Sequence, residues 1–128
     1  MGGVADDMAE PPRSRTILVV MDDEDLSEIV RDVLRAEGYE VVHGSRGEEA
    51  LERVKARGVR PALVLLDSWK PGMPGRFLHL LRQEPGFGDV PVVLCTTYKR
   101  FALPGVQGTL RMPFDLDELL LTVGEHVR

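Results

Sequence analysis

Short apolar runs alternate along the chain with segments in which apolar residues recur every three or four positions. The runs predict five strands, over residues 16–21, 39–43, 62–66, 90–95 and 108–112. The helical spacing predicts helices from Leu26 to a stop at Gly38, over residues 47–57, around 77–81, and over 116–127 after an N-cap at Asp115. Strands that alternate with helices indicate an α/β fold, with a parallel sheet covered on both faces.

Polar side chains follow three of the predicted strands. Asp22, Asp67 and Thr96 come directly after the runs 16–21, 62–66 and 90–95. Right-handed crossovers bring the carboxyl ends of parallel strands to one edge, where open α/β folds bind their ligands. A lone Asp after a strand is often only a loop residue, but three strands that deliver oxygen atoms to one rim favour a site.

The chemistry that such a rim can support is that of a metal and a phosphoryl group. Clustered carboxylates suit Mg²⁺, one further carboxylate can attack a phosphoryl group, and a hydroxyl can bond to the new phosphoryl oxygens. The acidic run 22–25 also has a simpler interpretation, because acidic residues at a helix N-terminus are favourable to the helix dipole. That interpretation accounts for Glu24 and Asp25 and leaves the role of Asp22 open.

Composition restricts the function classes further. The chain has 128 residues, of which 43% are hydrophobic and 29% charged, as expected for one soluble globular domain. Its net charge of −5 argues against nucleic acid as a direct partner. The single Cys95 is predicted to be a buried thiol in a reducing compartment, and no signal peptide or membrane span is apparent, so a cytoplasmic location is expected. Residues 1–15 predict a disordered leader, and residues 16–128 the folded domain.

The order of these motifs resembles the receiver domain of bacterial two-component response regulators. The segments that carry the resemblance are 17–24, 37–41, 47–51, 67–75, 90–96 and 113–114, followed by the last helix. The resemblance implies a doubly wound, five-stranded parallel sheet of the flavodoxin-like (CheY-like) kind. It also implies a role in phosphorelay signal transduction and no activity as an enzyme.

The resemblance assigns roles to individual residues. Asp67 is the expected phosphoacceptor, and Thr96 is the hydroxyl that responds to phosphorylation. Asp22, Asp67 and the backbone carbonyl of Trp69 are the expected Mg²⁺ ligands. The expected partners are a sensor histidine kinase or phosphotransfer protein and a downstream protein, with no direct contact to nucleic acid or membrane.

Two positions depart from the family pattern. Met21 stands where the family has the first acid of its pair, and Met112 stands where it has a lysine. The first change weakens the metal site, and the second removes a cation from the phosphoryl oxygens. The candidate substitutes are Asp23, Lys70, Lys99 and Arg111. Asp23 and Arg111 are in an unfavourable phase, because neighbouring side chains in extended chain point apart.

The segment between Thr96 and Met112 is also about half a dozen residues shorter than is usual for the family, so we expect a shortened or missing fourth helix. A basic and aromatic loop, residues 98–105, takes its place. Three functions stay open. The first is a receiver that is phosphorylated on Asp67, inefficiently. The second is a phosphorylation-independent receiver that binds other proteins, and the third is a small hydrolase, against which the absence of a glycine-rich phosphate loop argues.

Overall fold

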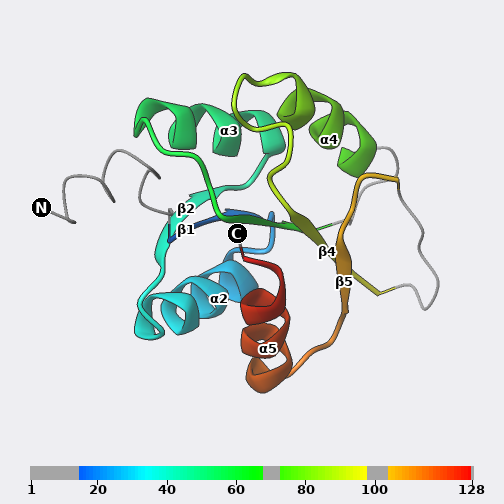
Figure 1. The fold of residues 1–128 in the computed structure, drawn as a ribbon. Coiled ribbons are helices and arrows are strands. Elements are labelled where there is room, and N and C mark those ends of the chain that lie inside the picture. The colour runs from blue at the N-terminus through cyan, green and yellow to red at the C-terminus, as the bar shows by residue number, and fades with distance from the viewer. Residues whose placement is uncertain (1–14, 68–72, 98–103, 128) are drawn as a thin grey trace, which may run out of the picture.

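A computed structural model describes residues 15–67, 73–97 and 104–127 (Figure 1). The order of its elements is β1 (Thr16–Val20), α2 (Glu24–Ala36), β2 (Glu40–Gly44), α3 (Gly47–Ala56), β3 (Leu63–Asp67), α4 (Met73–Gln83), β4 (Val92–Thr96), β5 (Gly108–Arg111) and α5 (Leu116–His126). The alternation of strands and helices predicted from the apolar pattern is therefore present.

The five strands form one parallel sheet in the order β2-β1-β3-β4-β5. Helices α3 and α4 cover one face, and α2 and α5 cover the other (Figure 1). This arrangement confirms the doubly wound, flavodoxin-like fold. It also places β2 and β5 at the two edges of the sheet and brings the carboxyl ends of all five strands to one side.

The core has two layers because successive side chains of a strand point to opposite faces of the sheet. On β1, Leu18 and Val20 pack toward α3 and α4, whereas Ile17 and Val19 pack toward α2 and α5. All of the residues of β1, β3 and β4 are buried. Strands buried on both faces appear in sequence as the continuous apolar runs from which they were predicted.

Side-chain caps and glycines set the ends of the helices. Asp23 caps α2 by accepting a hydrogen bond from the Leu26 N–H at 3.1 Å, and Asp115 caps α5 through the Glu118 N–H at 2.8 Å. Gly38 follows α2 with a φ of 91°, a conformation that a residue with a Cβ rarely adopts. The predicted N-cap at Asp115 and the predicted stop at Gly38 are both confirmed.

Several predicted boundaries were wrong, and one residue of the apolar pattern on each of two helices is exposed. Asp67 and Thr96 are the last residues of β3 and β4 rather than residues that follow them, because strand pairing continues through both. Likewise, β2 begins at Glu40 and β4 at Val92. The apolar spacing that predicts helices α2 and α5 includes Ile29 and Leu116, yet these two side chains are 52% and 45% exposed.

No helix is present between β4 and β5 in the part of that connection that the structure describes, residues 97 and 104–107. Lys99 and the rest of segment 98–103 lie outside the described residues. The predicted leader lies outside them too, apart from Arg15.

Candidate functional site at the carboxyl edge of the sheet

The polar residues predicted to form a site lie at the same edge of the sheet. Asp67 ends β3 and Thr96 ends β4, while Asp22 lies two positions beyond the end of β1. These three strands are neighbours in the sheet and run parallel. The fold therefore brings together the three strand ends that were predicted from the sequence to form a site.

Asp67 is a buried carboxylate within this edge. Its exposed fraction is 5%, and that of Thr96 is 2%. Asp67 has the same strand phase as Leu63 and Leu65, which pack toward α2 and α5, so its side chain belongs to that face of the sheet. A carboxylate in this position is held on a rigid strand and largely screened from bulk water.

Cys95 lies beside Asp67, a neighbour that the sequence did not reveal. The two residues are register partners on β3 and β4, and both have the phase of the α2 and α5 face. Burial raises the pKa of the Cys95 thiol to about 12, and the negative charge of Asp67 adds to the increase. The thiol is therefore protonated at neutral pH, and a thiolate nucleophile at this position is disfavoured.

Met21 lies on the other side of Asp67. It is 1% exposed and belongs to the apolar cluster beneath α2 and α5. Its N–H donates to the Gly44 carbonyl at 3.2 Å, so the strand pairing of β1 continues to this residue. Extending the register between Val20 and Leu66 by one residue sets Met21 next to Asp67. A thioether thus packs at the position where the family resemblance leads us to expect a carboxylate.

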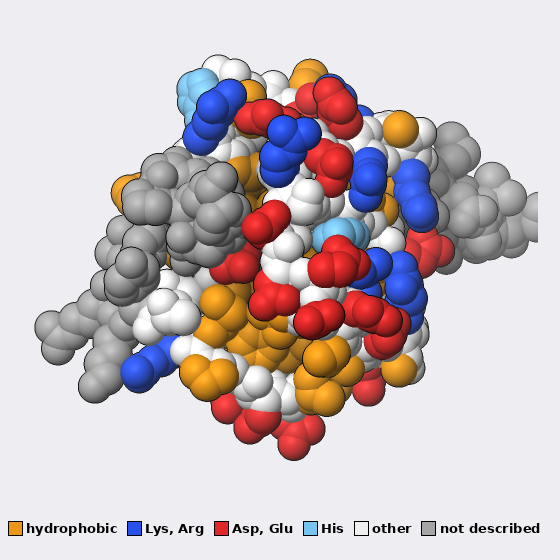
Figure 2. Space-filling view, turned by 180° about the vertical axis from the view of Figure 1, so that it is seen from behind, with side chains coloured by type: hydrophobic (Ala, Val, Ile, Leu, Met, Phe, Trp, Pro, Cys, Tyr) orange, Lys and Arg blue, Asp and Glu red, His pale blue; other side chains and the backbone are white. Residues whose placement is uncertain are grey.

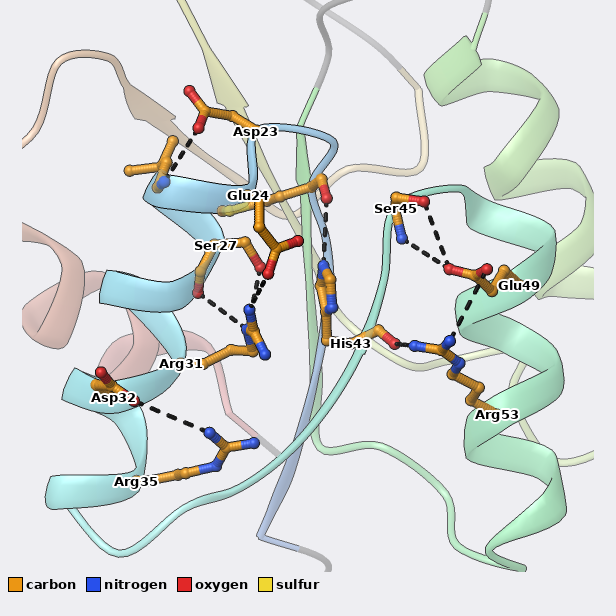
Figure 3. Close-up of polar contacts among 12 residues, drawn as sticks. Asp23, Glu24, Ser27, Arg31, Asp32, Arg35, His43, Ser45, Glu49 and Arg53 are labelled. Carbon is orange, nitrogen blue, oxygen red and sulfur yellow. Dashed lines mark hydrogen bonds and ion pairs between the residues drawn. The ribbon is translucent and has the colours of Figure 1, made fainter.

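The two acidic residues that follow Met21, Asp22 and Asp23, differ in their contacts. Both Asp22 and Asp23 are exposed. The carboxylate of Asp23 caps α2, an interaction that holds it at the helix N-terminus (Figure 3). The described residues contain no group of three or more His, Cys, Asp or Glu side chains suited to a metal. The remaining carboxylates, Asp22 and Asp67, are still compatible with Mg²⁺, which is commonly bound by one or two carboxylates together with water and phosphate oxygens.

Arg111, the candidate cation substitute on β5, does not take the place of the lysine that the family resemblance leads us to expect at Met112. Met112 follows β5, donates its N–H to the Thr96 carbonyl at 2.7 Å and packs partly buried against the α2 and α5 cluster. Arg111 is exposed and has the strand phase opposite to that of Leu110, which shares the α2 and α5 face with Cys95. Trp69 and Lys70 lie outside the described residues.

The sequence of residues 17–123 matches the family profile described as the response regulator receiver domain. The chain belongs to this family. It is a receiver domain of the kind found in two-component signalling systems.

Relatives of known name agree with this assignment. The chain is 38% identical over 110 residues to the protein Rrf1 of Nitratidesulfovibrio vulgaris, a match that covers 84% of this chain and 78% of Rrf1. It is 44% identical over 81 residues to the DNA-binding response regulator MtrA of Mycolicibacterium smegmatis, covering 62% of this chain and 33% of MtrA. The chain thus spans most of the first relative and only a third of the second.

Solved structures support the fold independently. The chemotaxis response regulator CheY4 of Vibrio cholerae superposes with a TM-score of 0.76 at 25% identity, covering 91% of this chain and all of CheY4. The response regulator TrrA of Thermotoga maritima, in complex with Mg²⁺ and BeF, superposes with a TM-score of 0.71 at 29% identity, covering 88% of this chain and 98% of TrrA. In the part of this chain that the structure describes, no helix is both long and apolar enough to cross a membrane.

Proposed function

We propose that this receiver domain accepts a phosphoryl group on Asp67, with Mg²⁺ bound by Asp22, Asp67 and the backbone carbonyl of Trp69, and that it does so inefficiently. The observation that carries the proposal is the buried carboxylate of Asp67 at the carboxyl edge of the sheet, with Thr96 at the end of the next strand. Receiver domains are signalling modules rather than classical enzymes, and this function requires no turnover of a free substrate.

The chemical step is a phosphoryl transfer between side chains. An oxygen of Asp67 attacks the phosphorus of a phosphohistidine on the donor protein, the P–N bond breaks, and the histidine nitrogen keeps the electron pair. Mg²⁺ supplies positive charge that offsets repulsion between the carboxylate and the phosphoryl oxygens. The Thr96 hydroxyl then donates a hydrogen bond to a phosphoryl oxygen.

The inefficiency follows from the two methionines. Met112 provides no cation for the phosphoryl oxygens, and a charge-assisted hydrogen bond is worth roughly 1.5–3 kcal/mol. Losing one such contact corresponds to a loss of about one to two orders of magnitude in the stability of the phosphorylated form. Met21 removes a carboxylate from the surroundings of the metal, which weakens Mg²⁺ binding.

Beryllofluoride provides the direct test, because it mimics a phosphoryl group on a carboxylate. The protein is mixed with Mg²⁺ and beryllofluoride, and the amide spectrum is recorded by NMR, with Asp67→Asn as the inactive variant. We expect saturable changes around β3 and β4 that Asp67→Asn abolishes. Treatment with acetyl phosphate should likewise add the mass of one phosphoryl group to the wild type only. Unchanged spectra at saturating reagent would refute the proposal.

A second function is supported by the apolar surroundings of Asp67. Met21 is buried in the core, and Met112 packs against it, so two positions at which the family resemblance leads us to expect charges are apolar here. The alternative is therefore a phosphorylation-independent receiver that works as a protein-interaction module. A partner that binds the wild type and Asp67→Asn equally would support it, and partner binding that requires Asp67 and a phosphodonor would count against it.

The partners proposed for either function are proteins. A sensor histidine kinase or phosphotransfer protein would donate the phosphoryl group, and a downstream protein would receive the signal. Exposed apolar side chains on α2 and α5 suit such contacts: Ile29, Leu116 and Leu121 are 52%, 45% and 65% exposed. Figure 2 shows apolar side chains gathered in its lower half, where these helices lie. A cytoplasmic location, expected from the lone thiol of Cys95, is part of the same proposal.

A further inference from the structure

A basic groove lies at the outer edge of the sheet, away from Asp67. It has a volume of about 490 Å³ and runs along β2 between α2 and α3. Its lining consists of Arg31, Arg35, Val41, Val42, His43, Arg53, Ala56 and Arg57. The lining thus combines four arginines with no carboxylate, on a chain whose net charge is −5, while Glu24, Asp32 and Glu49 beside the groove pair with Arg31, Arg35 and Arg53 at 2.7, 4.0 and 3.9 Å. Positive charge concentrated against the overall charge of the chain indicates an anionic ligand.

The arginines form two pairs, one on each helix, on either side of β2. Arg31 and Arg35 are four residues apart on α2, and Arg53 and Arg57 are four residues apart along α3 and its C-terminal cap. Side chains at this spacing share one helix face, and like charges there destabilise a helix by about 0.2–0.5 kcal/mol per pair. Figure 3 shows Arg31 and Arg35 on α2 and Arg53 on α3, with His43 between the two helices. A bound anion would offset the repulsion within each arginine pair.

Two of these guanidinium groups are held in place before any ligand binds. Arg31 donates from Nε to the Ser27 carbonyl at 3.2 Å and from Nη2 to Glu24 at 2.7 Å. Arg53 donates from Nη1 to the His43 carbonyl at 2.7 Å, and its Nη2 lies 3.9 Å from Glu49. A guanidinium group has five N–H donors, so each retains donors for a ligand. Arg57 has no ion pair among the described residues.

The contact between Arg53 and His43 also argues against an added β-strand as the occupant. Glu40 N–H pairs with Arg15 and the Gly44 carbonyl pairs with Met21, so the even-numbered residues of β2 bond toward β1. In a parallel ladder the groups of Val41 and His43 therefore point to the outer edge. Because Arg53 occupies the His43 carbonyl, a peptide that extended the sheet would have to displace it. A compact ligand in the groove can bind without displacing Arg53 from this carbonyl.

We propose that this groove binds a small ligand that carries several phosphate groups, such as a nucleoside triphosphate. Arginine is suited to phosphate because its planar fork makes two parallel hydrogen bonds. A chain of phosphates can contact the arginine pairs on both helices, and the side chains of Val41, Val42 and Ala56 can contact the organic part of the ligand. The volume lies within the usual range for small-molecule sites. This site is separate from Asp67 and does not depend on its phosphorylation.

The test measures binding of ATP and of inorganic tripolyphosphate by amide NMR, in EDTA so that no metal bridges the ligand to Asp67. The test variant is Arg35→Gln/Arg57→Gln, since neither side chain holds a backbone carbonyl. Arg76→Gln on α4 is the matched control, because it removes an exposed arginine that is paired with Glu48 at 3.2 Å outside the groove.

We expect saturable shifts confined to α2, β2 and α3, at least tenfold weaker binding in the double variant, and wild-type binding in Arg76→Gln and Asp67→Asn. The variant Arg35→Lys/Arg57→Lys, which keeps the charge, should lose affinity to a smaller extent and guards against an effect on folding. Equal losses in the double variant and in Arg76→Gln would overturn the proposal, as would unsaturable shifts. Binding of a poly-glutamate peptide in the groove without binding of either phosphate compound would also overturn it.

Discussion

Replacing Met21 by Asp tests whether the apolar packing beside Asp67 weakens the Mg²⁺ site that we propose there. Met21 is buried in the core and continues the β1–β3 register beside Asp67. Removing its side chain should destabilise the fold by about 2–5 kcal/mol, the usual range for a buried Met truncated to a small residue. Met21→Asn removes the same packing without adding a charge and is the matched control.

The electrostatic part of the effect can be estimated from the spacing of the strands. Neighbouring strands lie about 5 Å apart, and two ionised carboxylates at that distance repel by about 3 kcal/mol at an effective dielectric constant of 20. In EDTA we therefore expect Met21→Asp to be less stable than Met21→Asn by about that amount. Mg²⁺ bound at the proposed site would stabilise the folded state of Met21→Asp by about 2.7 kcal/mol at a concentration one hundred times its dissociation constant, so we expect it to remove most of this difference.

Urea unfolding in EDTA and in Mg²⁺ measures both contributions. The double variant Met21→Asp/Asp67→Asn removes the repulsion while keeping the new carboxylate, so it should resemble Met21→Asn in EDTA. If Met21→Asp and Met21→Asn unfold at the same urea concentration in both buffers, Met21 and Asp67 do not interact and the argument fails.

Three further outcomes are expected elsewhere in the molecule. The Cys95 thiol, fully buried and with a pKa of about 12, should react with a disulfide reagent only after urea unfolding, and rapid reaction of the native protein would contradict its placement. Asp115→Ala should cost about 1 kcal/mol in urea unfolding and Asp115→Asn much less, because Asn also caps helices. The hydrogen bond from Arg60 Nη2 at 2.8 Å, together with its charge, lowers the pKa of Asp89. The stabilisation is therefore present above the unfolded pKa of that Asp and lost as the pH falls through the lower folded value. An NMR titration should show a higher midpoint in Arg60→Gln, and an unchanged midpoint would rule out the contact.

The fold was predictable because its signals are local. Strands buried on both faces appear as apolar runs, and amphipathic helices appear as spacing of three and four. The errors fell where polar residues continue a strand, as at Asp67 and Thr96, since an apolar run ends before the backbone pairing does. The topology of parallel strands was also sufficient to predict that these residues share an edge with Asp22.

The neighbours of Asp67 were not predictable in the same way. That Cys95 lies beside it depends on the register between β3 and β4, which is a relation between distant segments. The basic groove was missed for a similar reason. The spacing of Arg31 and Arg35, and of Arg53 and Arg57, is visible in the sequence. Only the strand order reveals that β2 is an edge on which both pairs converge.

The two methionines are best understood together, because they act on the same face of the sheet. Met21 belongs to the apolar cluster beneath α2 and α5, and Met112 packs against that cluster, so each adds packing where the family resemblance leads us to expect a charge. A second acid beside Asp67 would repel it in the absence of a metal, and a buried cation would carry a desolvation cost. This edge of the sheet is thus stable without Mg²⁺ or a phosphoryl group. Under the proposed function, a phosphoryl group on Asp67 has less positive charge to pair with, so we expect its effect on the fold to depend mainly on Thr96.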